Sequence, residues 1–355
     1  MGPAPSVTRL TAPEIAAHLG VPLLRGRQIL AWVARGARGF EEMTDLPAAL
    51  REALPAKLRL LSSEISEIRE SPDSTRKLLV RLEDGELVEC VLIPAETRLT
   101  LCISSQVGCP ARCAFCASGM LGFTRSLLAH EIFEEFLHAA HVAGGAGEIT
   151  NLVLMGMGEP LLNYDEVVAA VRRLPLGKRR ITLSTVGLPD RIRRLAREGL
   201  PLNLAVSLHA PDDETRNRLV PVNRKYGIDE VVAAARDYFR ETGRDVTFEY
   251  ILIEGENAGP EHARRLAGLL RGGNLNVNLI PMNPVEGLPF RPPTPENVEA
   301  FRRRLEAAGI PVHVRTPRGR EIDAACGQLR LRRMKTSRPP PSGGQQPVAE
   351  GPPRA

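Results

Sequence analysis

Segments with strand character alternate with amphipathic helical segments over most of this chain, from residue 99 to about 315. Apolar runs typical of strands lie at 99–104, 151–155, 180–184, 202–208, 246–252 and 276–280. Helical periodicity marks 127–142, 165–173, 189–198, 229–241, 260–270 and 295–308. Such alternation implies a parallel sheet with right-handed crossovers. Because six units are too few for a closed eightfold barrel, the sequence predicts an α/β fold, an open, partial (β/α)6 barrel, with 312–315 as a further edge strand.

Three cysteines, Cys109, Cys113 and Cys116, stand within eight residues near the start of this core. Thiolates with this C-x3-C-x2-C spacing can converge on one centre from a loop, and they suit zinc or an iron–sulfur cluster. A structural zinc site and an ordinary 4Fe–4S cluster each need four ligands. A cubane held by these three would leave one iron open for chemistry. The alternative is a zinc knuckle completed by Cys102.

Polar residues stand at the ends of the expected strands, where parallel α/β barrels collect their catalytic groups. The loop at 156–160 fails the dinucleotide-binding fingerprint, but its glycine followed by one acid, Glu159, suits a cationic amino group. His209 is either a ligand contact or a hydrogen-bonded loop histidine. Asn283 suits a ribose or a carboxylate, although Asn before Pro is equally good turn chemistry. The full set is Gly158, Glu159, Ser184, Ser207, His209 and Asn283, and Leu208 is expected to point away from it.

The region ahead of the core, from residue 1 to about 70, has apolar residues at helical spacing in the segments 12–19, 26–34 and 47–61. Its many arginines fit a small module that docks RNA and, equally, the solvated faces of an ordinary bundle. A hairpin follows, with strands at 76–82 and 87–93 joined by a turn that contains Asp-Gly. Glu89 lies in its second strand, where it faces either solvent or a site in which it acts as a base.

Composition narrows the class of protein. Hydrophobic residues make up 43% of the chain, and no segment approaches the roughly 18 consecutive apolar residues of a membrane span. The first residues lack the pattern of a signal peptide. Six cysteines, three of them crowded together, favour metal or redox use in a reducing compartment, so we expect a cytoplasmic protein. A net charge of +5 permits a polyanionic partner without requiring one.

Five regions follow from these patterns. We expect an N-terminal helical accessory domain that docks RNA, a β-hairpin lead-in, the core, a C-terminal segment and a tail. Their bounds are 1–75, 76–98, 99–320, 321–335 and 336–355. The tail is rich in proline and glycine and cannot bury a core, so it is predicted to be disordered.

The motifs together resemble those of one family, the RlmN/Cfr adenine methyltransferases, which are radical S-adenosylmethionine (SAM) enzymes that act on RNA. The resemblance covers nearly all of residues 20–330. It rests on 27–29, 40–47, 102–116, 158–160, 207–209 and 322–329. The last stretch is the most specific, because other radical SAM families have no cysteine embedded there. Met282 departs from the pattern, since relatives often carry Trp at this place.

The resemblance implies a role for each candidate residue. The metal ligands would be Cys109, Cys113 and Cys116, holding a 4Fe–4S cluster whose fourth iron is open to SAM. The SAM site would comprise Gly158, Glu159, Ser184, Ser207, Leu208, His209 and Asn283. Cys326 corresponds to the cysteine that is itself methylated, Cys102 to its partner thiol, and Glu89 to the general base.

The implied reaction uses two SAM molecules per turnover to methylate carbon 2 of an adenine in 23S rRNA and of the adenine 3′ of the anticodon in tRNAs. It passes through methylated Cys326 and a transient RNA–protein adduct, and it ends with a disulfide to Cys102. An electron donor such as flavodoxin or ferredoxin, no membrane partner and a monomer are also expected. Two alternatives stay open: a carbon 8-specific enzyme of the Cfr type, and a non-catalytic, zinc-stabilised RNA-binding protein.

Overall fold

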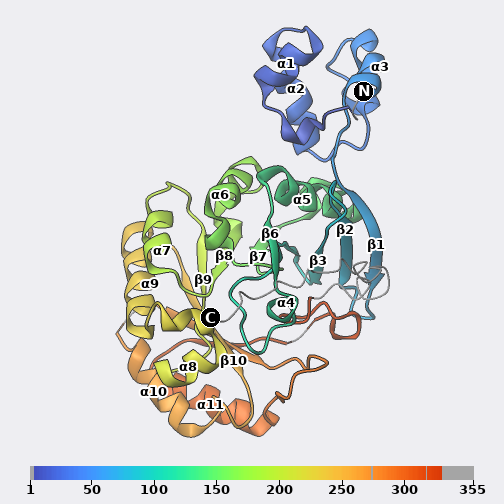
Figure 1. Ribbon diagram of the computed structural model, residues 1–355. Coiled ribbons are helices and arrows are strands. Elements are labelled where there is room, and N and C mark those ends of the chain that lie inside the picture. Colours follow the sequence, from blue (N-terminus) through green and yellow to red (C-terminus); the bar gives the residue numbers. More distant parts are fainter. Residues whose placement is uncertain (1–3, 273–274, 317, 330–355) are drawn as a thin grey trace, which may run out of the picture.

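The computed structural model describes residues 4–272, 275–316 and 318–329. Ten strands in these residues form one sheet, in the order β1-β2-β3-β4-β7-β8-β9-β10-β11-β12 (Figure 1). The expected tail at 336–355 and the end of the segment at 321–335 lie outside the described residues. Within the described part of the chain, no helix is long and apolar enough to cross a membrane.

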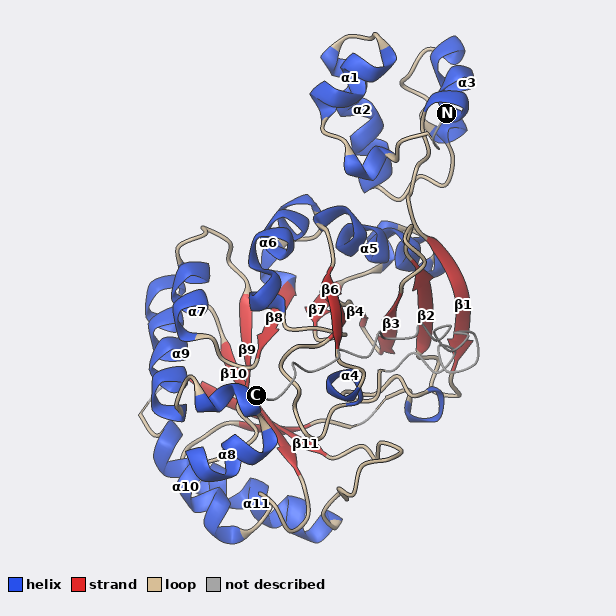
Figure 2. Ribbon diagram, viewed as in Figure 1, coloured by secondary structure: helices blue, strands red, loops and turns tan. Residues whose placement is uncertain are grey.

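The parallel part of the sheet is the expected core. Its strands are β4 (Arg98–Cys102), β7 (Asn151–Leu154), β8 (Ile181–Thr185), β9 (Asn203–Ser207), β10 (Val246–Leu252), β11 (Leu275–Pro281) and β12 (Val312–Val314). Helices lie along its outer side (Figure 2), namely α5 (Ala129–Ala143), α6 (Tyr164–Arg173), α7 (Pro189–Ala196), α9 (Ile228–Thr242), α10 (Pro260–Leu270) and α11 (Pro295–Ala307). The ends differ from those expected by no more than two residues, and the open, partial barrel is confirmed.

Alternate residues of the parallel strands divide between the hydrophobic core and the barrel interior. Leu204, Val206 and Phe248 are almost completely buried in the layer between the sheet and its helices. Each buried Å² of apolar surface stabilises the fold by about 25 cal/mol, so this layer is the main source of stability. Ser207 and Glu249 are paired across β9 and β10 and lie on the opposite face. The polar residues expected at a site therefore belong to the interior face of the sheet.

The N-terminal module contains α1 (Ala12–Leu19), α2 (Leu23–Ala34) and α3 (Ala48–Lys57), and it stands at one end of the core (Figure 1). Thr11 and Glu14 form a capping box at the start of α1. Gly26 lets α1 and α2 touch, because a Cβ there would lie 2.2 Å from the Ala12 carbonyl oxygen. The third helix was expected to reach residue 61 but ends at Lys57.

The expectation that helices continue to about residue 70 was wrong. Residues Glu64–Glu70 form β1, which pairs antiparallel with β2 (Arg76–Arg81), and β3 (Leu87–Ala95) completes this lead-in. Because the register shifts between Ile65 and Glu67, Ile65 and Ile68 share one face of the strand although they are three residues apart. A helix has the same apolar spacing, which explains the misreading. The lead-in thus has one strand more than a hairpin.

A buried carboxylate joins the N-terminal module to the core. Glu134 on α5 is fully buried, and its two oxygens accept hydrogen bonds of 2.8 Å from the backbone N–H groups of Ser62 and Ser63. The hydroxyl of Thr8 also donates to it. A buried charge is tolerated only with such partners. The module is therefore attached by specific contacts, and its removal would leave Glu134 without them.

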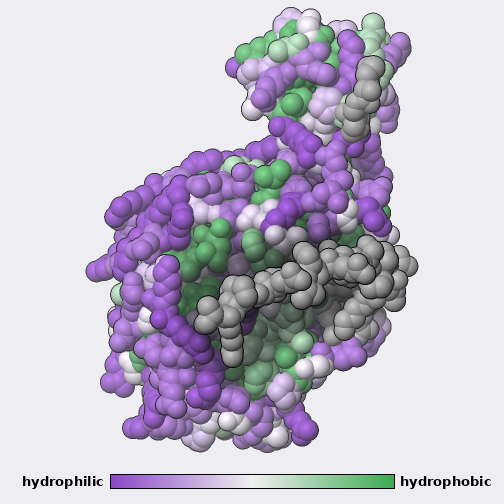
Figure 3. All heavy atoms as spheres, viewed as in Figure 1, coloured by the Kyte–Doolittle hydropathy of each residue, from purple (hydrophilic) through white to green (hydrophobic). Residues whose placement is uncertain are grey.

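Several short elements were not expected, because segments of three to seven residues carry too little periodicity to be recognised. A separate hairpin consists of β5 (Gln106–Gly108) and β6 (Phe123–Ser126), and two short helices are α4 (Ala117–Met120) and α8 (Asp213–Leu219). Short 3₁₀ helices lie at Val7–Arg9, Phe40–Glu42, Ala146–Glu148, Pro160–Asn163, Lys178–Arg180, Pro221–Arg224 and Arg320–Ile322. In Figure 3, apolar side chains gather in the hollow of the core, while its surroundings are mostly hydrophilic.

Candidate active site

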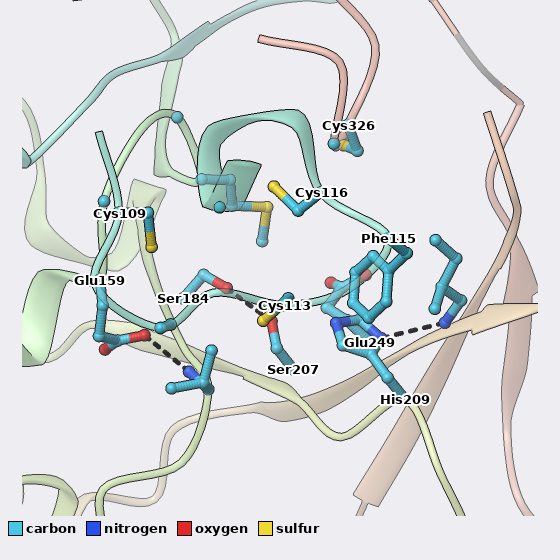
Figure 4. Close-up of a pocket in the computed structure, with 18 of the residues that line it drawn as sticks. Cys109, Cys113, Phe115, Cys116, Glu159, Ser184, Ser207, His209, Glu249 and Cys326 are labelled. Atoms are coloured by element: carbon cyan, nitrogen blue, oxygen red, sulfur yellow. Dashed lines mark hydrogen bonds between the residues drawn. The ribbon is translucent and has the colours of Figure 1, made fainter. Parts of the chain in front are cut away.

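The cysteine loop lies between β5 and α4 and lines a cavity in the barrel interior (Figure 4). Gly108 allows the loop to close, since a Cβ there would lie 2.0 Å from the Gly122 carbonyl oxygen, which also accepts a hydrogen bond of 2.8 Å from Cys109 N–H. The N–H of Ala114 donates to the Leu219 carbonyl at the end of α8. The loop is thus anchored on both sides, by the β5–β6 hairpin and by the end of α8.

The sulfur atoms of Cys109, Cys113 and Cys116 face one cavity, and all three thiols are free. Burial raises the pKa of the Cys109 thiol to about 12 and that of Cys113 well above its usual range. Bound metal would reverse this by stabilising the thiolates. Three thiols around one cavity match the soft ligands that an iron–sulfur cluster takes.

Gly158 and Glu159 form the wall of the cavity beyond β7. Gly158 has φ +105°, and a Cβ there would lie 2.6 Å from the Ser105 hydroxyl, so only glycine fits. The Glu159 carboxylate accepts hydrogen bonds of 2.8 Å from Val186 N–H and 3.0 Å from Leu161 N–H. Burial nevertheless raises the pKa of Glu159 to about 7. A fixed, buried acid of this kind is suited to a cationic ligand group.

Ser184, Ser207 and His209 lie on the opposite wall of the same cavity (Figure 4). The two hydroxyl oxygens are 3.5 Å apart. His209 has φ 60°, and its Nδ1 accepts a hydrogen bond of 3.1 Å from Ile251 N–H, which places the ring proton on Nε2. Burial, assisted by the charge of Arg216, lowers the pKa of His209 to about 3, so the ring is neutral. His209 thus combines the two expected roles, since it is hydrogen-bonded and also lines the cavity.

A buried arginine under this wall was missed. Arg216 on α8 is completely buried and donates to the backbone carbonyl oxygens of Leu208 at 3.0 Å and Ser207 at 3.2 Å. It also donates to the Val186 carbonyl. The side chain of Leu208 packs in the main hydrophobic core, so only its backbone is near the site. The sequence gives no sign of this role, because Arg216 stands in a charged segment that resembles a solvated helix face.

A second cavity adjoins the first and is lined by Cys102, Asn283, Arg315 and Cys326 among others. Cys326 and Arg315 line both cavities. Burial raises the pKa of the Cys102 thiol well above its usual range, and the neighbouring Cys326 adds to this effect. Cys326 itself is exposed. Cys102 therefore belongs to this second cavity, away from the wall formed by the cysteine loop, where a zinc knuckle would need it.

Asn283 holds the segment that carries Cys326. Its side-chain N–H donates to the Cys326 carbonyl oxygen at 3.2 Å, and its oxygen accepts a hydrogen bond of 3.0 Å from Arg320 Nε. It lines the second cavity, whereas the other expected SAM-binding side chains line the first. The resemblance placed Asn283 at the SAM site, and in this structure the side chain is occupied with the C-terminal segment.

Glu89 lies on the same face of the sheet as Cys102. Val91, two residues after Glu89, is directly opposite Cys102 in the antiparallel pair of β3 and β4. Glu89 is only 3% exposed, and its Oε1 lies 3.2 Å from the ammonium of Lys77. It therefore faces the barrel interior, which settles the choice between solvent and interior in favour of the interior.

An ion pair lies where the two cavities meet. Glu249 lines the first cavity and accepts a hydrogen bond of 2.9 Å from the Asn278 side chain. Its other oxygen is 3.5 Å from the Arg315 guanidinium, which lines both cavities. Neither residue was predicted as part of the site. A carboxylate within the apolar strand 246–252 was the available signal, since an acid in a buried strand needs a partner.

Comparison with known proteins agrees with this arrangement. Residues 103–267 match the radical SAM superfamily. A probable dual-specificity RNA methyltransferase RlmN of Rhodopirellula baltica is 50% identical over 316 residues, 87% of this chain and 85% of that protein. The protein of the same name from Symbiobacterium thermophilum is 48% identical over 343 residues, 94% of this chain and 92% of that protein. A crystal structure of a radical SAM methyltransferase from Sphaerobacter thermophilus superposes with a TM-score of 0.87 at 47% identity, covering 92% of this chain and 99% of that one.

Membership of the radical SAM superfamily implies a 4Fe–4S cluster and SAM as cofactors. The similarity extends well beyond that domain, through the N-terminal module and the segment with Cys326, in relatives of the same length. The chain therefore belongs to the RlmN family of radical SAM methyltransferases.

Proposed function

We propose that this protein methylates carbon 2 of one adenine in 23S rRNA, near the peptidyl-transferase centre, and of the adenine 3′ of the anticodon in tRNAs. The observation that carries the proposal is the place of Cys326, which lines both the cavity of the cysteine loop and the cavity of Cys102. The relatives named dual-specificity RNA methyltransferases support two kinds of RNA substrate.

A sulfur in this position answers a chemical difficulty. Carbon 2 of adenine is electrophilic, so the positively charged methyl group of SAM cannot be transferred to it directly. A thiol can accept that methyl group and then present it to the base from the protein. Cys326 borders the proposed SAM cavity and is exposed, so it can reach both SAM and a base brought from outside.

The cofactors would be held by the residues of the first cavity. Cys109, Cys113 and Cys116 would bind the cluster, and Glu159 would bind the amino group of SAM. The remaining proposed SAM contacts are Gly158, Ser184, Ser207, the backbone of Leu208, His209 and Asn283. When bound, the cluster and a second SAM supply a radical that removes one hydrogen atom from the methyl group on Cys326.

Three side chains then complete the transfer. Cys326 carries the carbon that bonds to the base, so the RNA is joined to the protein through sulfur. Glu89 takes the proton from carbon 2 of the ring, and the unpaired electron of the adduct would return to the cluster. Cys102 attacks the sulfur of Cys326, so that an S–S bond forms as the CH₂–S bond breaks, and the released carbon takes a proton to become the new methyl group. A thiol reductant must afterwards reduce the disulfide, since both cysteines begin as thiols.

The N-terminal module is the proposed RNA-docking part of the chain. Its Arg27, Arg35 and Arg38 are exposed, as phosphate-binding side chains must be. Deleting the module would strip the partners from buried Glu134, so neutralising arginines is the cleaner test. In R27Q/R35Q, RNA affinity should fall and its salt dependence should flatten, while SAM cleavage without RNA is unchanged. Unchanged RNA affinity would contradict this part of the proposal.

We further propose that the protein is a monomer in the cytoplasm and that flavodoxin or ferredoxin supplies the electron for its cluster.

The deciding experiment is mass spectrometry of 23S rRNA and tRNA from a deletion strain, complemented with the wild-type gene or with C326A. The proposal expects a methyl group on adenine carbon 2 to be lost from both RNAs and restored by the wild-type gene alone. Loss of a carbon 8 methyl group would show instead an enzyme of the Cfr type. Unchanged methylation in the deletion strain would reject the function.

A further inference from the structure

Lys77 on β2 is a buried lysine with two different contacts. Its ammonium lies 3.2 Å from Oε1 of Glu89, and it donates a hydrogen bond of 3.2 Å to the Asp323 carbonyl oxygen. Only 6% of Lys77 is exposed. A lysine is rarely buried to this extent unless its charge is matched. One ammonium thus connects Glu89 on β3 with the segment that carries Cys326.

The register of the strands brings these groups together. Leu79 lies directly opposite Glu89, so Lys77, two residues earlier, is on the same face and diagonal to Glu89. Arg69 on β1 is directly opposite Lys77, but its own ion-pair partner is Glu67, at 2.7 Å. The cation in direct contact with the Glu89 carboxylate from this side is therefore Lys77.

The segment that carries Cys326 is held after that residue by a backbone hydrogen bond of 2.9 Å from Ala117 N–H to the Gly327 carbonyl, and up to that residue by contacts with side chains. Gly319 N–H donates to Asp73 Oδ2 at 3.0 Å, near the start of the segment, and Asn283 donates to the Cys326 carbonyl at 3.2 Å. The contact of Lys77 lies between them, three residues before Cys326. It differs from the other two because the same ammonium also touches Glu89.

We propose that Lys77 is a positioning residue that couples Glu89 to the segment carrying Cys326. The inference rests on the proposed function, in which Glu89 is the general base. A cation beside a carboxylate favours the anionic form, which is the form that accepts the ring proton. Once Glu89 holds that proton, its attraction for Lys77 weakens. Lys77 is then held less firmly, and its hydrogen bond to the Asp323 carbonyl loosens. This happens at the step in which Cys102 must reach the sulfur of Cys326.

The test uses the reconstituted full-length enzyme and the variants K77M, K77R and E89Q. R81M is the matched control, because Arg81 lies on the same strand, is half-exposed and pairs with Glu64 rather than Glu89. Three properties are measured: methylation of Cys326 by mass spectrometry, the RNase-sensitive adduct on a denaturing gel, and hydrogen–deuterium exchange of residues 319–329. The exchange measurement needs neither SAM nor turnover.

K77M should be methylated on Cys326 normally but resolve its adduct at least about tenfold more slowly, with faster exchange at 319–329. K77R keeps the positive charge, so it should restore most of the rate of adduct resolution and most of the protection from exchange at 319–329. E89Q should accumulate adduct and show exchange at 319–329 that is faster than in the wild type but slower than in K77M, because its neutral side chain attracts Lys77 less while the Lys77–Asp323 contact is weakened rather than removed. Should K77M prove insoluble, K77M/E89Q replaces it, and faster exchange than in E89Q alone is then expected.

Resolution at the wild-type rate in K77M, or loss of Cys326 methylation in it, would overturn the role of Lys77. So would equal exchange in E89Q and K77M/E89Q. These outcomes differ from those expected if the proposed function itself is wrong. If it is wrong, E89Q would form no adduct, and C326A would still methylate RNA.

Discussion

The parallel strands β7 to β11 and the antiparallel strands β1 to β3 present different chemistry on the interior face of one sheet. The parallel side carries Glu159, Ser184 and Ser207 around the cysteine loop. The antiparallel side carries Glu89 with Lys77, next to Cys102 on β4, where the two halves of the sheet meet. Radical SAM chemistry is thus proposed for the parallel half, proton transfer for the lead-in, and the sulfur exchange of Cys102 for β4, where the two halves meet.

The two halves also differ in the partners of their buried carboxylates. On the parallel side, Glu159 accepts hydrogen bonds from uncharged groups, the backbone N–H groups of Val186 and Leu161 and the side chain of Thr185, and burial raises its pKa to about 7. On the antiparallel side, Glu89 has the ammonium of Lys77 within 3.2 Å. A site that awaits a cationic ligand can leave an acid without a cation, whereas a base that must stay ionised needs one nearby. The difference indicates that the charge of Glu159 is to be balanced by a cationic ligand, whereas that of Glu89 is balanced by Lys77.

The largest effect is expected at Cys326, which belongs to both cavities. C326A should abolish RNA methylation and form no covalent adduct, because Cys326 is the one thiol among the described residues that line both cavities. Cluster content and SAM binding should be retained, since the ligands are on the parallel side. Product and adduct are measured by mass spectrometry and on a denaturing gel. An adduct in C326A would break the assignment.

C102A should stop turnover at a later stage. Cys326 should still receive its methyl group and join the base, and the enzyme should then accumulate as an RNase-sensitive adduct, because the thiol proposed to release it is gone and the thiols of the first cavity are the proposed cluster ligands. Removal of Cys90, a buried thiol on the adjacent strand β3, serves as the control. C90A should turn over without accumulating adduct. Normal product release in C102A would exclude Cys102 as the thiol that releases the RNA.

Arg216 tests the structural support of the parallel half. R216M would leave buried carbonyl oxygens of Val186, Ser207 and Leu208 without a donor, and should lower the free energy of unfolding by about 2–4 kcal/mol. R218M on the same helix removes only exposed, long ion pairs and should cost less than about 0.5 kcal/mol. Denaturation of both metal-free variants measures the difference. Equal stability would show that Arg216 does not support the wall.

Sequence reasoning recovered the parallel half far better than the lead-in. Periodicity located its strands because buried parallel strands are apolar and the intervening helices amphipathic. The bulge in β1 gave that strand a helical spacing, so the start of the lead-in was misread. The roles proposed for Glu89, Cys102 and Cys326 come from the family resemblance. Lys77, Arg216 and Arg315 were not, because their roles depend on register and on contacts between distant segments.

The smallest expected effect concerns the proton on Glu159. Its pKa of about 7 lies above the ordinary value of 4.5, so the SAM-free protein holds this proton below about pH 7, and its stability falls as the pH rises from about 4.5 to 7. If the ammonium group of SAM binds beside Glu159, it should lower that pKa and expel the proton. Calorimetry in buffers of different ionisation enthalpy should therefore detect most of one proton released near about pH 6 and little near about pH 8. E159Q provides the baseline, and equal proton release by E159Q and the wild type would place the amino group of SAM elsewhere.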